Sequence, residues 1–443
     1  MKLLLILPGV GKRKNTPYIN TWQMEPLMIS QIAAITPDDI EIKFYDDRVE
    51  EINFEEDADL VAITVETYTA KRAYFISSKF RKRGIPVIMG GFHPTLVPNE
   101  CIKYADSIVI GEVEGVWNNL INDFKNNNLK PSYQKILTSF PKGIMPKRAI
   151  YNDKKYLPVC LIESARGCPY NCEFCSVTNF YNHNYKIRPI DDVIKDMKTS
   201  GKKTFFIVDD NIVADIKRTK ELLRAMIPLN IIWAGQGSIH VAEDEELLYL
   251  LKKSGCKMLL IGFESLNKKA LNKMNKKWNL TIGEYNKLIA NIYKYDIGIY
   301  ATFVFGYGDE DEKTFENTYK FALKNKFLFG AFNHLLPFPG TPLYERLEKE
   351  NKLLYKKWWL KDNYKYGDIS FKPDKLSPEE LRDLCVKYRR KFFSTSSILK
   401  RALNFRGNLK SPSFAMIYFV QNFLQQKEVE MKFGMPIGDG LDE

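Results

Sequence analysis

Three cysteines lie close together in a chain that is otherwise poor in cysteine. Cys168, Cys172 and Cys175 fall within "RGCPYNCEFCSVTNF", and the 443 residues contain only seven cysteines. A structural zinc site needs four ligands, commonly as two CxxC pairs, and the other cysteines are far away in the sequence: Cys101, Cys160, Cys256 and Cys385. A cubane cluster held by three thiolates leaves one iron open to a substrate. The spacing therefore favours an iron-sulfur cluster over a closed zinc site or incidental packed thiols.

Length and composition indicate a multidomain globular protein from a reducing compartment. A chain of 443 residues with 45% apolar content has room for two or three domains with large cores. An odd number of mostly scattered cysteines argues against a secreted disulfide scaffold, so the expected location is the cytoplasm. The opening "MKLLLILPG" is predicted to be a first strand rather than a signal peptide, because its apolar run stops at Pro8 and no cleavage site follows.

The positive charge of the chain is concentrated near the C-terminus. The formal net charge is +12, and the range 386–427 contains nine Lys and Arg residues without a single Asp or Glu. Elsewhere both signs are mixed, so no nucleic-acid partner is expected. No apolar run approaches the ~20 residues needed to span a bilayer, so any membrane contact would be peripheral.

Residues 1–130 alternate short buried strands with helical patterns. The expected strands are near-continuous aliphatic runs at 2–8, 41–47, 60–65, 86–91 and 107–112. This alternation predicts a doubly wound, Rossmann-like parallel sheet, in which ligands bind beyond the carboxyl ends of the strands. Three of these ends, at 64–69, 90–95 and 111–115, are rich in Gly, Thr, His and Glu. They form either a ligand site or simply tight strand-to-helix turns.

A second alternating series follows a polar linker at 131–158. Its expected strands lie at 159–165, 204–208, 231–239, 258–263, 299–306 and 331–337. Six strand-helix units over 159–342 predict a partial (β/α)6 barrel, an open relative of the eightfold α/β barrel. The cysteine cluster directly follows the first strand, where barrels place their chemistry. Residues 343–443 are expected to form a mostly helical region.

With these elements in place, the CxxxCxxC spacing resembles that of the radical S-adenosylmethionine (radical SAM) superfamily. Five further segments resemble its successive strand-end motifs: "FFIVDDN", "GQGSI", "IGFES", "FVFGYGDED" and "LLPFPGTPLY". Residues 1–130 resemble the cobalamin-binding domain found in one branch. The whole chain is similar to cobalamin-dependent radical SAM proteins such as the hopanoid C-methylases and the anaerobic magnesium-protoporphyrin cyclase.

The resemblance implies roles for individual residues of the barrel. Cys168, Cys172 and Cys175 would hold a [4Fe-4S] cluster whose open iron binds S-adenosylmethionine (SAM). Phe174 would pack near the adenine, and Gly306 would allow close passage of the nucleoside. The polar residues expected to hold the rest of SAM are Asp209, Asp210, Asn211, Gln236, Ser238 and Glu264. As an alternative, Asp209 to Asn211 would cap the next helix.

The same resemblance implies a cobalamin site at the strand ends of the first domain. The residues expected there are Thr64, Val65, Glu66, Thr67, Gly90, Gly91, Phe92, His93, Gly111, Glu112 and Glu114. Many cobalamin proteins carry DxHxxG after the first strand, with His as the lower cobalt ligand, but here that segment is "PGVGKRKNTPYIN". Cobalamin is therefore expected without histidine below the cobalt. His93 would contact the corrin periphery or be a simple loop histidine.

The implied activity is C-methylation of a hydrophobic substrate, a lipid or another small molecule. A 5'-deoxyadenosyl radical would abstract hydrogen from an unactivated carbon, and methylcobalamin would supply the methyl group. Ferredoxin or flavodoxin would donate the electron. No catalytic acid-base pair is expected; Tyr307 and His334 either touch substrate or only pack. The aromatic, basic C-terminal region fits an anionic lipid surface or a helical cap over the barrel.

Three other functions compete with this interpretation. A transfer RNA methylthiotransferase would need three cysteines in the N-terminal domain, and this chain has only Cys101 there. A non-catalytic cobalamin or lipid sensor is disfavoured by the intact cysteine triad. A cyclase or ring-rearranging enzyme that uses cobalamin without methyl transfer remains open.

Overall fold

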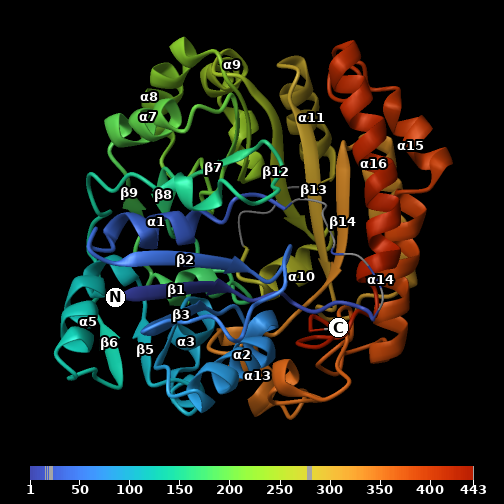
Figure 1. Ribbon diagram of the computed structural model, residues 1–443. Helices are drawn as coiled ribbons and strands as arrows, with labels where there is room; N and C mark the ends of the chain where they lie inside the picture. The colour runs from blue at the N-terminus through green and yellow to red at the C-terminus, as the bar shows by residue number, and fades with distance from the viewer. Residues whose placement is uncertain (15, 17, 19–22, 277–281, 443) are drawn as a thin grey trace.

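Two six-stranded sheets and a set of C-terminal helices make up the protein (Figure 1). The computed structural model describes residues 1–442 except 15, 17, 19–22 and 277–281. Figure 1 shows the N-terminal sheet, blue to cyan, below the green-to-orange second sheet, with the red helices along one flank. Both sheets are parallel, as the alternating sequence patterns predict.

The N-terminal sheet has the strand order β2-β1-β3-β4-β5-β6, typical of a doubly wound fold. Its strands are β1 (Lys2–Leu7), β2 (Glu41–Asp46), β3 (Leu60–Thr64), β4 (Val87–Gly90), β5 (Ser107–Ile110) and β6 (Ser132–Gln134). The connecting helices are α1 (Leu27–Ile35), α2 (Ala70–Lys82), α3 (Phe92–Leu96), α4 (Pro98–Cys101) and α5 (Trp117–Lys125). Central strands such as β1 are buried on both faces, which explains their continuous aliphatic sequences.

The second sheet is the predicted partial barrel, with its strands in sequence order. They are β7 (Cys160–Ile162), β10 (Thr204–Ile207), β11 (Ile232–Gly237), β12 (Cys256–Glu264), β13 (Gly298–Phe305) and β14 (Phe329–His334). Its helices are α6 (Ser176–Phe180), α7 (Ile190–Thr199), α8 (Ile216–Met226), α9 (Glu245–Lys253), α10 (Lys268–Lys273), α11 (Ile282–Lys294) and α12 (Glu312–Lys324). A short hairpin of β8 (Ala165–Arg166) and β9 (Lys186–Ile187) frames the cysteine loop.

The C-terminal region is mostly helical, but its aromatic first part is not. The helices are α13 (Pro342–Lys349), α14 (Pro378–Phe392), α15 (Thr395–Ala402) and α16 (Pro412–Lys432). Between α13 and α14, the segment expected to be helical from "KKWWLKDNYKYGDISF" contains only one 3-10 turn, Trp358–Leu360. Its aromatic side chains explain the difference, because Trp358 and Trp359 are buried in the core beneath the N-terminal sheet. This packing fixes an irregular backbone.

The end of the chain returns to the N-terminal domain. The Lys12 amide donates to the Asp439 carbonyl (2.9 Å), and the Gly438 amide donates to Val10 (2.7 Å). The buried guanidinium of Arg72 pairs with Asp47 (2.9 Å) and with Asp442 near the C-terminus (2.5 Å). The last residues of the chain are thus fastened to the N-terminal domain. None of the described helices has the length and apolar character needed to cross a bilayer.

Candidate functional site

The three clustered cysteines line one cavity of about 280 Å³ at the carboxyl edge of the barrel. They lie in the loop between β8 and α6, and Phe174 lines the same cavity. Gly167 precedes Cys168 with a φ of +80°, and a Cβ there would lie 2.1 Å from the carbonyl oxygen of Asn184. Only glycine fits this position. The backbone turn at Gly167 thus leads directly into the cysteines that line the cavity.

Polar residues from successive strands complete this cavity. At the carboxyl ends of β10, β11 and β12, the predicted residues Asp210, Asn211, Gln236, Ser238 and Glu264 all line it. They meet because the carboxyl ends of parallel strands share one edge. The hydroxyl of Ser238 is buried without a hydrogen-bond partner among the described atoms, and a buried polar atom of this kind points to a missing ligand. The donors and acceptors suit the amino, carboxylate and ribose groups of SAM.

Glu264 owes its orientation to an unusual backbone and to a lysine that the sequence patterns missed. It ends β12 with a φ of +58°. Its Oε1 accepts from Nζ of Lys276 at 2.7 Å, and Lys276 lines the cavity too. Lys276 lies in the loop after α10. A loop has no hydrophobic periodicity from which the direction of a side chain could be predicted. Thr302, on β13, is a second lining residue that was not predicted.

Asp209 and Gly306 do not lie where the sequence analysis expected them. Asp209 is buried behind the cavity and accepts from the amides of Ser164 (2.6 Å) and Ala165 (3.0 Å) and from the Ser164 hydroxyl. Burial raises its pKa to about 7, although these hydrogen bonds oppose the rise. Asp209 therefore holds the strand that leads into the cysteine loop. Gly306 faces the C-terminal region, where a Cβ would lie 2.8 Å from the ring of Phe371.

The alternative that Asp209 to Asn211 cap a helix is also wrong. The next helix, α8, is capped by Asp215, whose carboxylate accepts from the Arg218 amide at 3.0 Å. Asp210 instead accepts from the Gly167 amide at 3.0 Å. The acidic pair after β10 thus braces the cysteine loop from two sides.

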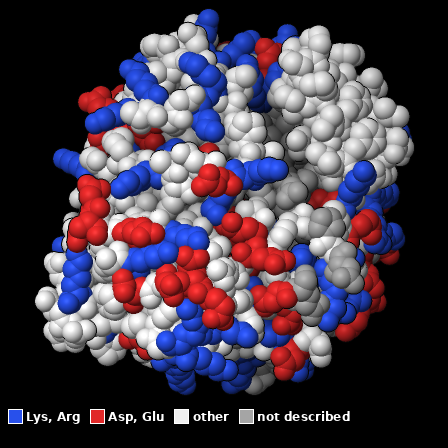
Figure 2. Space-filling view, viewed as in Figure 1, with Lys and Arg blue, Asp and Glu red and all other residues white. Residues whose placement is uncertain are grey.

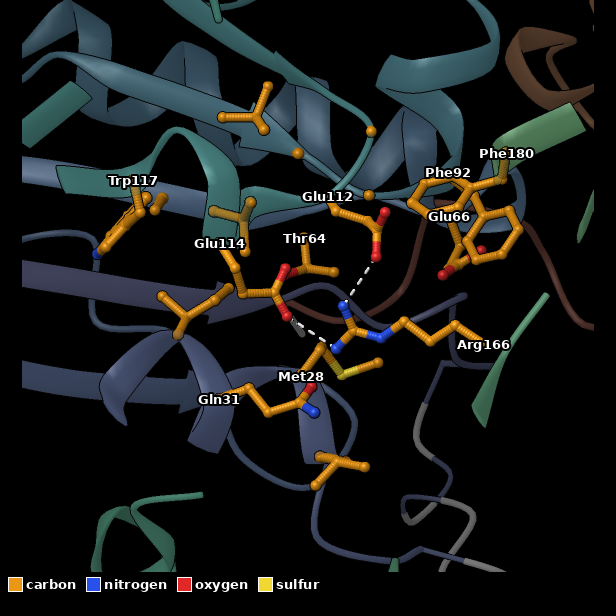
Figure 3. Close-up of a pocket in the computed structure, with 18 of the residues that line it drawn as sticks. Met28, Gln31, Thr64, Glu66, Phe92, Glu112, Glu114, Trp117, Arg166 and Phe180 are labelled. Atoms are coloured by element: carbon orange, nitrogen blue, oxygen red, sulfur yellow. Dashed lines mark hydrogen bonds and ion pairs between the residues drawn. The ribbon is translucent and has the colours of Figure 1, made fainter. Parts of the chain in front are cut away.

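A second cavity, of about 240 Å³, opens at the carboxyl edge of the N-terminal sheet and faces the barrel (Figure 3). The predicted residues that line it are Thr64, Glu66, Gly90, Gly91, Phe92, Gly111, Glu112 and Glu114. Gly91 has a φ of +108°, and a Cβ there would lie 2.9 Å from the Val65 carbonyl oxygen. Glycine is therefore required at this position for the close approach of the loop to β3 and for its positive φ. Leu27, Met28 and Trp117 give the cavity an apolar inner wall that the sequence patterns did not reveal.

Arg166 links the two cavities. It lies two residues before Cys168, and its guanidinium contacts three carboxylates: Glu163 at 2.8 Å, Glu112 at 3.0 Å and Glu114 at 2.7 Å. Lys186 also pairs with Glu112. In Figure 3 the Arg166 side chain crosses the cavity toward the loop that follows β5. Glu112 and Glu114 of the N-terminal domain therefore connect this domain to the barrel by their ion pairs with Arg166. Their charges are neutralised by these pairs and are not available to a ligand.

Three residues of the expected cobalamin set do not line this cavity. The Val65 side chain is buried in the core, and Thr67 and His93 bond to each other at 3.3 Å. The imidazole of His93 is fully buried and contacts Oε1 of Glu100 at 3.2 Å. Burial alone would raise the Glu100 pKa, but its hydrogen bonds, that from His93 first, lower it to about 2. His93 is thus a structural residue, not a contact of the corrin periphery.

Glu66 is the one carboxylate of this cavity that no described cation pairs with, and its side chain is accessible from the space of the cavity. The protein that encloses the cavity on its other sides displaces water from the carboxyl group, and this desolvation raises the pKa of Glu66 to about 7. Figure 3 places Glu66 beside the stacked rings of Phe92 and Phe180, whose centroids are 4.2 Å apart. Glu66 therefore offers a proton-dependent hydrogen-bonding group to whatever occupies the cavity.

Tyr307 and His334, the two residues left open as substrate contacts, line neither cavity. The Tyr307 hydroxyl is buried and lies 3.4 Å from Oε2 of Glu173. Nδ1 of His334 lies 2.9 Å from the Leu335 carbonyl oxygen. Both are packing residues at the ends of barrel strands.

Comparisons with known proteins agree with this arrangement. Residues 162–322 match the Radical SAM superfamily. The chain is 33% identical over 419 residues to bacteriochlorophyllide d C-12(1)-methyltransferase of Chlorobaculum tepidum, covering 91% of this chain and 88% of that relative. It is 26% identical to the anaerobic magnesium-protoporphyrin IX monomethyl ester cyclase of Cereibacter sphaeroides, covering 77% and 60%.

Solved structures show the same fold. The cobalamin-dependent radical enzyme OxsB has a TM-score of 0.67 at 13% identity and covers all of this chain and 77% of its own. The methyltransferase TsrM of Kitasatospora setae has a TM-score of 0.62 at 16% identity, covering 79% and 75%. Both were solved with cobalamin bound, and TsrM also with its [4Fe-4S] cluster.

The fold is that of the cobalamin-dependent radical SAM enzymes. The chain belongs to the radical SAM superfamily and, within it, to the family of bacteriochlorophyllide d C-12(1)-methyltransferase. The cofactors predicted from the sequence are those bound in these structural neighbours, a [4Fe-4S] cluster and cobalamin in TsrM and cobalamin in OxsB. The resemblance drawn from the cysteine motif and strand-end segments is confirmed.

Proposed function

We propose that this enzyme methylates an unactivated carbon of a hydrophobic substrate. The observation that supports this most is the shared position of the cysteine loop. On one side its cysteines line the cavity suited to SAM, and on the other Arg166 and Tyr181 line the cavity at the N-terminal sheet. A substrate held beside this loop, between the two cavities, would be within reach of both cofactors.

When bound, the cluster and SAM supply the radical that removes a hydrogen atom, and cobalamin supplies the methyl group. Cys168, Cys172 and Cys175 would hold the cluster. Asn211, Gln236, Ser238 and Glu264 would orient SAM, with Phe174 against its adenine. The bare backbone at Gly90, Gly91 and Gly111, with Thr64 and Glu66, would hold cobalamin. The apolar wall of this cavity would help to exclude water from the radical.

The proposal extends to substrate and partners. The relatives named for bacteriochlorophyllide d support a flat, hydrophobic macrocycle as the first substrate class to test. An external one-electron donor such as ferredoxin or flavodoxin would reduce the cluster. We also propose cytoplasmic location with peripheral membrane contact, which would suit a hydrophobic substrate.

A cyclase that uses the same cofactors without methyl transfer is the second candidate, because the magnesium-protoporphyrin cyclase covers much of this chain. The anaerobically reconstituted enzyme should be incubated with methyl-labelled SAM and a reductant, in parallel with bacteriochlorophyllide d and with a lipid extract. Label in a carbon-methylated product is the expected result. Deoxyadenosine formed together with an unlabelled, altered substrate would support the cyclase instead.

The variant Cys172→Ala is the negative control for this experiment, because it removes a cluster ligand. Cys256→Ala is its matched partner: Cys256 is buried in the barrel core and lines neither cavity. Label transfer that survives in Cys172→Ala would contradict the proposal.

A further inference from the structure

The outer side of α15 and α16 presents a continuous series of exposed apolar side chains. We call it the C-terminal apolar face; its members are Leu399, Leu403, Phe405, Met416, Ile417, Val420, Phe423 and Leu424. Phe405 is 68% exposed and Met416 65%. On α16 these residues recur at helical spacing, which places them on one side of the helix. Figure 2 shows the corresponding region, at upper right, almost without charged side chains.

The inner side of the same helices is anchored by polar groups, so the apolar face cannot turn inward. Arg401 is fully buried and donates to the carbonyls of Phe327 (2.9 Å) and Leu328 (3.0 Å) and to Oδ1 of Asn422 (3.0 Å). The Tyr418 hydroxyl donates to the Ile398 carbonyl at 2.7 Å. The helices also bury apolar side chains such as Ile398 and Val429 in the barrel core, so they are apolar on the outer side as well as the inner one, whereas a surface helix is usually polar outward. Such a surface indicates an interaction site.

The basic residues of this region fall into two groups. Several are already engaged: Lys387 pairs with Glu312 (2.6 Å), Arg390 with Glu430 (2.6 Å) and Lys391 with Glu316 (2.8 Å). These pairs neutralise much of the positive charge that the sequence concentrates here. Their positions on α14 place them outside the apolar face.

The second group borders the apolar face without an acidic partner in the described chain. Lys400 follows Leu399 directly, and Arg406 follows Phe405 and contacts only a carbonyl, that of Lys294 at 3.4 Å. Lys427 lies one helical turn beyond Leu424. All three cations are exposed, and the range 386–427 contains no acid. The face therefore combines apolar side chains with uncompensated positive charge.

We propose that the C-terminal apolar face rests on an anionic lipid surface. Apolar side chains with flanking Lys and Arg are the composition of helices that lie in the membrane interface. A second copy of this chain fits less well, because a two-fold contact through this face would bring the same three cations of both copies together, and the range 386–427 contains no acid to offset them. The inference deepens the membrane contact that forms part of the proposed function. Its test needs no turnover, so the two can fail separately.

The test is co-flotation of the reconstituted full-length protein with vesicles. Vesicles of phosphatidylcholine alone are compared with vesicles that also contain phosphatidylglycerol, at low and high salt. The charge variant Lys400→Glu/Lys427→Glu should weaken binding to the anionic vesicles by at least about 25-fold, since each surface cation contributes roughly fivefold. Its matched control, Lys198→Glu/Lys217→Glu, reverses two exposed lysines on α7 and α8 and should bind like wild type.

A second variant tests the apolar part of the face. Phe405→Ser/Met416→Ser/Val420→Ser should reduce binding to both kinds of vesicle. Its control, Ile136→Ser/Ile232→Ser/Tyr249→Ser, removes three similarly exposed apolar side chains elsewhere on the surface. Circular dichroism and cluster absorbance should stay unchanged in all variants, because the altered side chains point outward.

Three results would overturn the inference. The first is wild-type protein that stays with the soluble fraction on anionic vesicles at low salt. The second is vesicle binding that the face variants do not change. The third is a wild-type dimer, measured by light scattering, that dissociates in the serine variant while vesicle binding is absent; it would assign the face to a second copy of the chain.

Discussion

Replacing Arg166 with methionine should destabilise the protein at the junction of its two cavities. The Arg166 side chain is only 6% exposed and is the only described cation that pairs with Glu114 and Glu163, whereas Glu112 also has Lys186. Methionine would therefore leave two poorly hydrated carboxylates without a counter-ion. Breaking a buried pair from one side typically costs about 3–5 kcal/mol. We expect the free energy of unfolding of the apo-protein to fall by this amount.

A double-mutant cycle separates the ion pair from a general loss of packing. Glu114→Gln removes one of the stranded charges, so Arg166→Met should be less harmful in that background. For side chains in direct contact we expect a coupling of about 1.5–3 kcal/mol. The assay is urea unfolding followed by tryptophan fluorescence, with cobalamin titration as a second readout. Strictly additive single and double variants, within ~0.5 kcal/mol, would refute the role given to Arg166.

Three further predictions concern single residues. Cys172→Ala should lose the iron and visible absorbance of the reconstituted cluster, while Cys256→Ala, in the barrel core, should keep both. Gly306→Ala should lower the free energy of unfolding by about 1–3 kcal/mol through overpacking against Phe371, while SAM affinity, measured by equilibrium dialysis, stays unchanged. A selective loss of SAM binding would instead show that Gly306 belongs to the SAM site. Glu66 has a folded-state pKa of about 7, above its ordinary 4.5. Ionisation of Glu66 is therefore less favourable in the folded state than in the unfolded state, so the free energy of unfolding falls as the pH rises from about 4.5 to about 7. Glu66→Gln should therefore have a higher Tm than wild type near pH 8, a difference that vanishes near pH 5.

The site residues that the sequence predicted well are those fixed by topology. Once the strands are parallel and in order, their carboxyl ends must share an edge, and this brings Asn211, Ser238 and Glu264 to the cysteine loop. Predictions failed where side-chain direction mattered. Neighbouring residues at a strand end point to opposite sides, so Asp210 lines the cavity while Asp209 lies behind it.

Residues that act across the domain boundary could not be predicted from local patterns. Arg166 is more than fifty residues from its partners Glu112 and Glu114 in the sequence. No local pattern in either segment indicates that the two segments are in contact. His93 looked like a ligand contact because it follows a glycine-rich strand end. Its actual partner, Glu100, is itself bound by Trp359 from the C-terminal segment at 2.8 Å. That contact also explains why the tryptophan-rich segment is not a helix.

The cysteine loop is held in position by contacts from both domains. From the barrel, Asp209 and Asp210 hold the backbone at Ser164 and Gly167. From the N-terminal domain, the loop after β5 holds Arg166 between these two points. The four residues from Ser164 to Gly167 are thus held by contacts from both domains. A shift of either domain would therefore move Cys168, the first cysteine of the loop. Reactions that bring a radical, a methyl donor and a substrate together need alignment of this kind, because a misplacement of about 1 Å can cost 100-fold in rate. We therefore expect the ion pairs at Arg166 to act as positioning contacts for the cysteine loop.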